Sequence, residues 1–143
     1  MVKVTCDFDG VFAEHPLPIE TRFAGDSHFK IQDRLSFRRQ KPKKITIDTL
    51  EDIEADKIVI VTGRPDYEVP KLTKWFVINK IEVEEIIGFP GTPNSNKDVR
   101  LNKLEVIRKI APECSLEDDR IVLESLPLEI GKILIINDSM EIL

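Results

Sequence analysis

The 143-residue sequence has no apolar run approaching the ~20 residues that are needed to cross a bilayer. Its N-terminus is predicted to be a β-strand and lacks the pattern of a signal peptide. It also lacks an internal repeat, a coiled-coil heptad and a low-complexity segment. These absences argue against a membrane-spanning protein and a repeat architecture, and we expect a cytoplasmic location (the host cytoplasm for a viral protein) and no membrane partner.

Cysteine is scarce, and the two cysteines, Cys6 and Cys114, lack the spacing of metal ligands. Cys6 lies in a predicted buried strand and Cys114 in a predicted turn, so we expect free, reduced thiols. An apolar content of 41% and a charged content of 33% are typical of a soluble globular protein. The length predicts one domain, residues 1–143, with a sizeable core.

Basic residues are fewer than acidic ones, which gives a net charge of −5. This negative charge argues against indiscriminate nucleic-acid binding. Residues 13–44 are the exception, with eight basic side chains against four acidic ones. A basic segment in an acidic protein can steer an anionic substrate, so residues 22–44 are candidates for nucleic-acid contact. The alternative is a solvated loop with ordinary surface charges.

Strands that alternate with helices predict an α/β fold with a three-layer, Rossmann-like parallel sheet. Buried strands are expected over residues 2–6, 57–62, 83–88 and 132–136. Helices are expected over residues 48–55, 66–79 and 98–110. Ser115 and Asp118 resemble a capping box, which predicts a further helix ending at Pro127, with a strand at 121–123 as the alternative.

Residues 13–47 are too long for a simple connection, and they predict a short flap with strands near 20–24 and 28–31. Ile45, Thr46 and Ile47 are expected to pair briefly as a strand. No insert is long enough for a large cap domain. Because the chain stops five residues after Asp138, we expect no closing strand and an exposed sheet edge that a second copy of the chain could cover.

The chain is organised around Asp7 and Asp9, which end the first predicted strand just before Gly10. Open α/β sheets bind ligands at the carboxyl ends of their strands. Two carboxylates so close together repel each other unless a cation lies nearby, so the pair points to a divalent metal. The alternative is a turn in which the aspartates only cap the backbone.

Polar groups also follow two later strands: Thr62, Gly63 and Arg64 after one, and Asp138 after the other. All these strand ends are expected at one edge of the sheet. Asp7, Asp9 and Asp138 would there form an all-oxygen site suited to Mg²⁺. The N–H groups at Gly63 can bind phosphate. A lysine from the next helix would offset charge; Lys103 is the candidate, and Lys97 is the alternative.

This order of motifs resembles the haloacid dehalogenase-like (HAD) superfamily of phosphohydrolases. The resemblance rests on Asp7-Phe8-Asp9-Gly10, on strand–Thr62-Gly63-Arg64, on a helical lysine and on strand–Asn137-Asp138-Ser139. Within the superfamily, the segments 61–65 and 72–76 with Lys103 look like the phosphatase domain of polynucleotide kinase/phosphatases.

The resemblance implies a role for each matching residue. Asp7 would be the nucleophile and Asp9 the general acid and base. Thr62 would hydrogen-bond the transferring phosphoryl group, and Lys103 would orient Asp7. Mg²⁺ would be held by Asp7, by the backbone carbonyl of Asp9 and by Asp138, and the substrate would contact Gly10, Gly63 and Arg64.

The sequence therefore predicts a Mg²⁺-dependent phosphomonoesterase that acts on a nucleotide or a polynucleotide terminal phosphate. A phosphatase of small metabolites is the alternative within the enzyme class. A binding protein with a decayed site is another, because Asn137 stands where the family often has an acid. A signalling receiver domain fits less well, since its phosphoacceptor lies on a later strand and it does not need Asp9.

Overall fold

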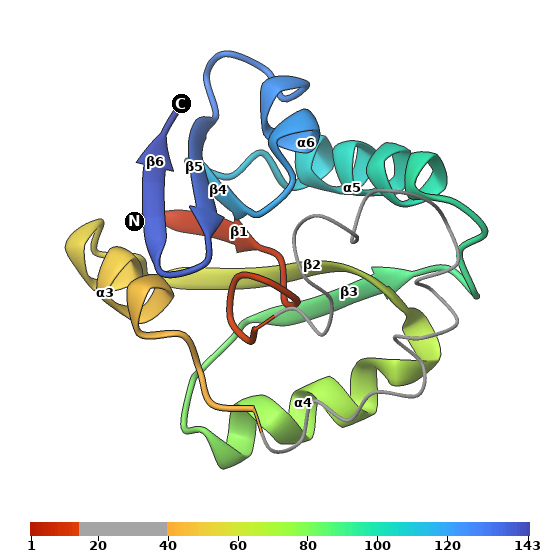
Figure 1. Cartoon of the computed structure of the whole chain (residues 1–143), viewed down its shortest axis with the longest axis horizontal. Helices are drawn as coiled ribbons and strands as arrows, with labels where there is room; N and C mark the ends of the chain where they lie inside the picture. Colours follow the sequence, from red (N-terminus) through yellow and green to blue (C-terminus); the bar gives the residue numbers. More distant parts are fainter. Residues whose placement is uncertain (15–39) are drawn as a thin grey trace.

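The computed structural model describes residues 1–14 and 40–143. Its centre is a six-stranded sheet in the order β3-β2-β1-β4-β5-β6 (Figure 1). The strands are β1 (Lys3–Cys6), β2 (Lys57–Pro65), β3 (Glu85–Phe89), β4 (Cys114–Glu117), β5 (Gly131–Ile136) and β6 (Ser139–Ile142). The first five are parallel, and only β6 runs antiparallel to its neighbour β5. The carboxyl ends of β1, β2 and β4 therefore lie side by side.

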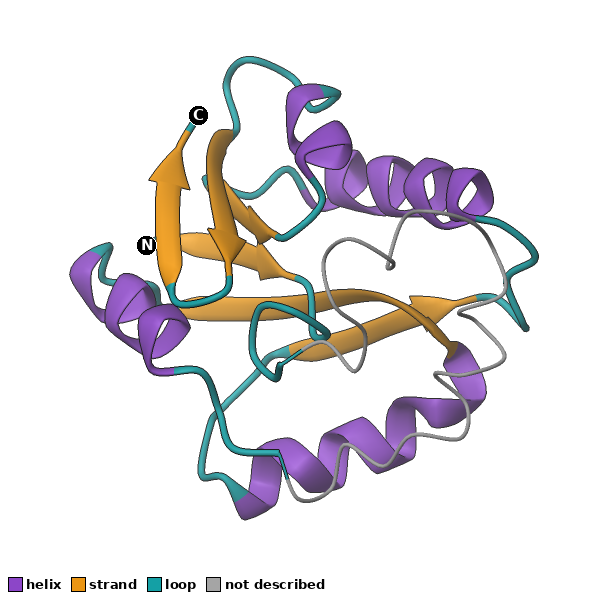
Figure 2. Ribbon diagram, in the orientation of Figure 1, coloured by secondary structure: helices purple, strands orange, loops and turns teal. Residues whose placement is uncertain are grey.

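Helices pack on both sides of this sheet, α3 and α4 on one side and α5 and α6 on the other (Figure 2). They are α3 (Lys44–Asp52), the 3₁₀ helix η1 (Asp66–Glu68), α4 (Val69–Ile78), α5 (Asn96–Ile110) and α6 (Arg120–Glu124). The predicted three-layer α/β fold is thus confirmed. The flap strands expected near 20–24 and 28–31 lie outside the described residues.

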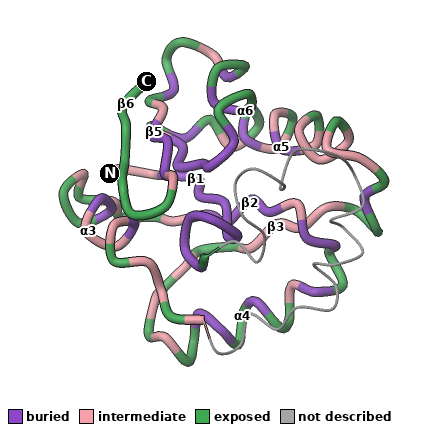
Figure 3. The backbone as a smooth tube through the Cα atoms, in the orientation of Figure 1, coloured by how far each residue is buried: buried purple, intermediate pink, exposed green. Residues whose placement is uncertain are grey.

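The side chains of β2 alternate between the two faces of the sheet, and each face carries its own hydrophobic core. Ile60 packs into the cluster that contains Leu72 of α4, whereas Val59 and Val61 pack into the cluster that contains Ile107 of α5. Successive side chains of a strand point to opposite faces, so a wholly apolar strand indicates helices on both faces. Buried backbone accordingly follows the central strands in Figure 3.

An aromatic cluster beneath the end of β1 holds the first strand against α4. The Phe76 ring lies edge-on to Phe8, Phe12 and Trp75, with centroids 5.8, 5.2 and 5.0 Å away. The Trp75 indole also donates a hydrogen bond to the Gln40 carbonyl at 3.0 Å. The backbone that carries Asp7 and Asp9 is therefore held in place by the packing of these rings.

We expect Phe76→Ala to lower the free energy of unfolding by about 3–5 kcal/mol, because it removes a buried ring and leaves a cavity. The matched control is Val77→Ala at the next position of α4, where the side chain is 70% exposed. That change is expected to stay within about 0.5 kcal/mol. Urea unfolding monitored by circular dichroism measures both, and equal losses would contradict this assignment of the core.

The predicted short strand at 45–47 is wrong, because these residues lie in α3, which begins at Lys44 rather than near Asp48. The Lys43 backbone N–H donates to the Phe12 carbonyl at 2.8 Å, and the Thr46 hydroxyl donates to the Val11 carbonyl. These contacts with the turn after β1 hold the start of the helix, so tertiary contact overrides the strand preference of β-branched residues.

The predicted helix at 115–127 is also wrong in its first half, since Cys114–Glu117 form β4. Ser115 does not cap a helix: its hydroxyl accepts a hydrogen bond from the Thr5 hydroxyl of β1 at 2.8 Å. The cap of α6 is Asp119, whose carboxylate accepts from the Ile121 N–H at 3.1 Å. The strand considered at 121–123 is likewise replaced by α6.

The expected absence of a closing strand is wrong, and the exposed edge of the sheet is β6 rather than β5. Asn137 has a positive φ of 53°, and Asn137-Asp138 form a two-residue turn that leads into β6. Ile136 pairs with Ser139 across the turn, so a closing strand covers β5. Among the described residues, no helix is long and apolar enough to cross a membrane.

Candidate active site

The turn after β1 carries the two aspartates that the sequence singles out. The Asp7 N–H donates to the Leu116 carbonyl of β4 at 3.0 Å, and the Asp7 carboxylate accepts from the Phe8 N–H at 2.8 Å. Gly10 has φ +84°, and its N–H donates to the Ala13 carbonyl at 2.7 Å. Glycine adopts this left-handed conformation without strain, so the chain coils back directly after Asp9.

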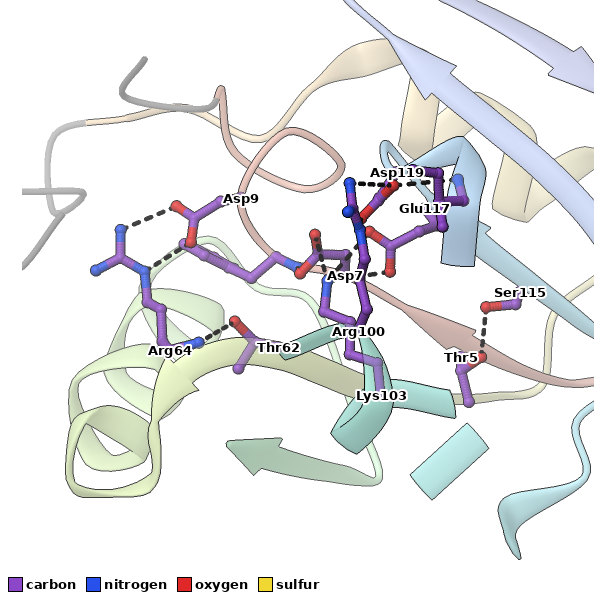
Figure 4. A network of polar contacts seen from close by, with 12 residues as sticks. Thr5, Asp7, Asp9, Thr62, Arg64, Arg100, Lys103, Ser115, Glu117 and Asp119 are labelled. Carbon is purple, nitrogen blue, oxygen red and sulfur yellow. Dashed lines mark hydrogen bonds and ion pairs between the residues drawn. The ribbon is translucent and has the colours of Figure 1, made fainter. Parts of the chain in front are cut away.

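Asp7 lies against the predicted lysine (Figure 4). The Lys103 Nζ is 3.1 Å from the Asp7 carboxylate, and the lysine is only 5% exposed. Burial alone lowers the pKa of Lys103, but the carboxylates of Asp7 and Glu117 outweigh burial and raise it. Lys103 is therefore a permanent cation beside Asp7. Lys97, the alternative, is exposed in the first turn of α5.

Asp9 forms a second buried ion pair, with Arg64 at the end of β2. The guanidinium holds both carboxylate oxygens, with Nε at 2.8 Å and Nη2 at 2.9 Å. Glu68 lies 3.6 Å from the same guanidinium. The charges of Asp9 and Glu68 raise the pKa of Arg64 although burial opposes them. A bidentate pair fixes the orientation of Asp9, so Arg64 contacts Asp9 here rather than solvent.

Thr62 and Gly63 complete the end of β2. The Thr62 hydroxyl is buried and accepts a hydrogen bond from the Arg64 N–H at 3.1 Å. A Cβ at Gly63 would lie 2.7 Å from Val99 Cγ1, so only glycine lets the first turn of α5 approach the strand this closely. The glycine thereby helps to place α5, and with it Lys103.

Three acids at the end of β4 were missed in the sequence-based prediction: Glu117, Asp118 and Asp119. All three are buried, and oxygens of Asp7, Glu117 and Asp118 lie within 4.8 Å of one another. Asp119 pairs with Arg100 of α5, whose Nε is 2.7 Å away. The signal in the sequence is the acidic run 117–119 after the short segment 114–116, which was interpreted as the first turn of a helix.

Glu117 is the most deeply buried of these acids, at 1% exposure. Both of its carboxylate oxygens are 3.1 Å from the Lys103 Nζ. Burial first, and then the charge of Asp7, raise the pKa of the Glu117 carboxyl well above its ordinary value. Asp7, Lys103 and Glu117 therefore form one connected group.

The structure does not bring Asp138 to this group. Asp138 is exposed in the turn between β5 and β6, and β4 separates β5 from β1 in the sheet. The reason is topological: β4 was not recognised as a strand, so β5 appeared to follow directly in the sheet. Asp118, at the end of the strand next to β1, occupies the place that was expected for Asp138.

The donors fit a hard divalent cation. Asp7, Glu117 and Asp118 offer only carboxylate oxygens, which are the ligands preferred by Mg²⁺. The three acids are buried together, and Lys103 contacts two of them, Asp7 and Glu117. An added cation would relieve the remaining repulsion between the carboxylates.

No known protein family and no curated protein matches the sequence. Among solved structures, the chain is similar to the HAD domain of effector protein Lem4 from Legionella pneumophila. The identity is 19% and the TM-score 0.44, and the match covers 86% of this chain and 75% of that chain.

Proposed function

We propose that this protein is a divalent-metal-dependent phosphomonoesterase that works through an aspartyl-phosphate on Asp7. The observation that carries the proposal is the pairing of Asp7 with Lys103 at 3.1 Å, next to a buried group of acids. A second aspartate, Asp9, stands two residues away on the same turn and is held by Arg64. A nucleophilic carboxylate, a fixed cation and a separate acid–base carboxylate are the parts that this reaction needs.

In the first step, an Asp7 carboxylate oxygen attacks phosphorus, and the bond from phosphorus to the leaving oxygen breaks. The leaving oxygen takes a proton from Asp9 and departs as an alcohol; for this, Asp9 must first release its two-point contact with Arg64 and bind that proton. In the second step, Asp9 removes a proton from water, which attacks the aspartyl-phosphate, releases inorganic phosphate and restores Asp7. Lys103 would offset negative charge in both steps, and the Thr62 hydroxyl would hydrogen-bond the phosphoryl group.

Asp7 and Asp118 would hold the metal ion, with the backbone carbonyl of Asp9 as a further donor. When bound, Mg²⁺ supplies charge neutralisation for a phosphoryl oxygen close to the acids. This assignment moves the later acidic ligand from Asp138 to Asp118.

For the substrate, we propose a nucleotide or a polynucleotide with a terminal phosphate. The resemblance of segments 61–65 and 72–76 to polynucleotide phosphatases supports this choice. So does Lys43, whose Nζ lies 3.1 Å from the Gly10 carbonyl and places a basic side chain at the turn that carries Asp9. A cation at this position can attract a polyanion.

The test is phosphate release by the wild-type protein with Mg²⁺ over a panel of substrates. The panel contains an aryl phosphate, mononucleotides, and oligonucleotides phosphorylated at the 3′ or 5′ end. We expect release from the nucleotide substrates, and its loss when EDTA removes the metal. Faster release from the aryl phosphate would favour a small-metabolite phosphatase, and no release from a folded, metal-binding protein would favour a binding role.

A further inference from the structure

Glu117 is a buried acid for which the proposed reaction has no direct use. It is the last residue of β4, and β4 lies next to β1, so Glu117 faces the Asp7 backbone from the neighbouring strand. A carboxyl group this deeply buried costs free energy unless a partner compensates it. Its compensation is Lys103, which both of its oxygens contact at 3.1 Å.

The same contacts fix the position of the lysine. The Lys103 Nζ lies 3.1 Å from the Glu117 carboxyl and 3.1 Å from Asp7 Oδ2. A lysine side chain has several rotatable bonds, so a single partner leaves its ammonium able to take up several positions. Two carboxyl groups from adjacent strands define one place for the ammonium.

We propose that Glu117 is a positioning residue, which holds the Lys103 ammonium on the Asp7 carboxylate. Its effect on the reaction rests on the proposed function; its effect on the lysine does not. Glu117 acts through Lys103 and touches neither the phosphoryl group nor the leaving oxygen. The nearby Asp118 remains the metal-binding partner of Asp7.

The kinetic test uses Glu117→Gln, which keeps the shape of the side chain but replaces one of the two oxygens that accept from Lys103 with an amide nitrogen that cannot. We expect kcat to fall by about 10–100-fold, as for other residues that orient a catalytic group, while KM changes by less than about twofold. In a Lys103→Met background, the same change should have no further effect beyond about twofold, because its target is gone. Glu113→Gln, on the exposed residue that precedes β4, is the matched control.

Two kinetic results would overturn the proposal. Losses that add up in the Glu117→Gln/Lys103→Met double variant would show that Glu117 acts independently of the lysine. An unchanged kcat at saturating Mg²⁺, with a large loss of Mg²⁺ affinity measured by calorimetry, would make Glu117 a metal ligand instead.

A second measurement does not depend on activity. In NMR spectra of protein with nitrogen-labelled lysine, the Lys103 ammonium protons should exchange slowly in the wild type and quickly in Glu117→Leu. Slow exchange in both proteins would overturn the proposal. If the wild type releases no phosphate but the exchange still depends on Glu117, the proposed function fails while the positioning role stands.

Discussion

Replacing Asp7 with asparagine is expected to reduce phosphate release on the order of 10⁵-fold, because the amide cannot form the aspartyl-phosphate. The fold should survive the change. Lys103 keeps the Glu117 carboxyl as a hydrogen-bond acceptor at 3.1 Å, so the buried ammonium is not left without a partner. Steady-state rates, with thermal unfolding measured in parallel, separate the loss of chemistry from a loss of structure.

A matched control is Asp52→Asn, at the exposed end of α3. It makes the same chemical change far from the turn after β1 and should leave the rate within about twofold. Mass spectrometry after rapid acid quenching should find a phosphorylated peptide containing Asp7 in the wild type alone. A variant Asp7→Asn that retains a tenth of the activity would mean that the nucleophile is another residue.

The second large effect is expected at Asp118. Asp118→Asn should lower the rate by about 10³-fold, equivalent to about 4 kcal/mol, because a carboxylate ligand beside Asp7 is lost from the acidic group. Asp138→Asn should stay within about twofold, since that side chain is exposed in the turn between β5 and β6. Titration calorimetry with Mg²⁺ should give the same contrast in affinity.

This pair of variants also tests the strand order directly. The two changes are chemically identical and differ only in which strand end carries the aspartate. A large loss at Asp138 with little effect at Asp118 would restore the assignment made from the sequence. Equal losses at both positions would mean that the metal does not bind Asp118 in preference to Asp138.

Much of the fold could be predicted because its strands and helices carry strong local patterns. β2 contains the unbroken apolar run 58–61, and α5 buries Lys103 and Ile107 on one face, four residues apart. Lys103 was singled out because it lies in the first turns of the predicted helix, where a cation could reach a phosphoryl group; its burial beside Ile107 was not predicted.

β4 could not be predicted because its polar residues are satisfied by a distant strand. Ser115 in the middle of a short strand looks like a helix cap, and only the hydrogen bond with Thr5 makes it a strand residue. Without β4, the sequence-based prediction named Asp138 as the later metal ligand, whereas the proposal made from the structure names Asp118. The pairing of Arg64 with Asp9 was missed for the same reason, since no local pattern encodes a contact across the sheet.

The central position of β1 in the sheet determines when its two edges can pair during synthesis of the chain. β1 is synthesised before both of its neighbours, β2 and β4, and the Asp7 N–H donates to the carbonyl of Leu116 in β4. At ribosomal speeds of about 5–20 residues per second, this first strand waits roughly 5–20 s for its second neighbour. A nascent chain that ends before residue 114 contains Asp7 and Lys103 but lacks the strand that gathers the acids. The site therefore assembles only after β4 has been made, and until then β1 keeps an unpaired edge that could pair with another chain.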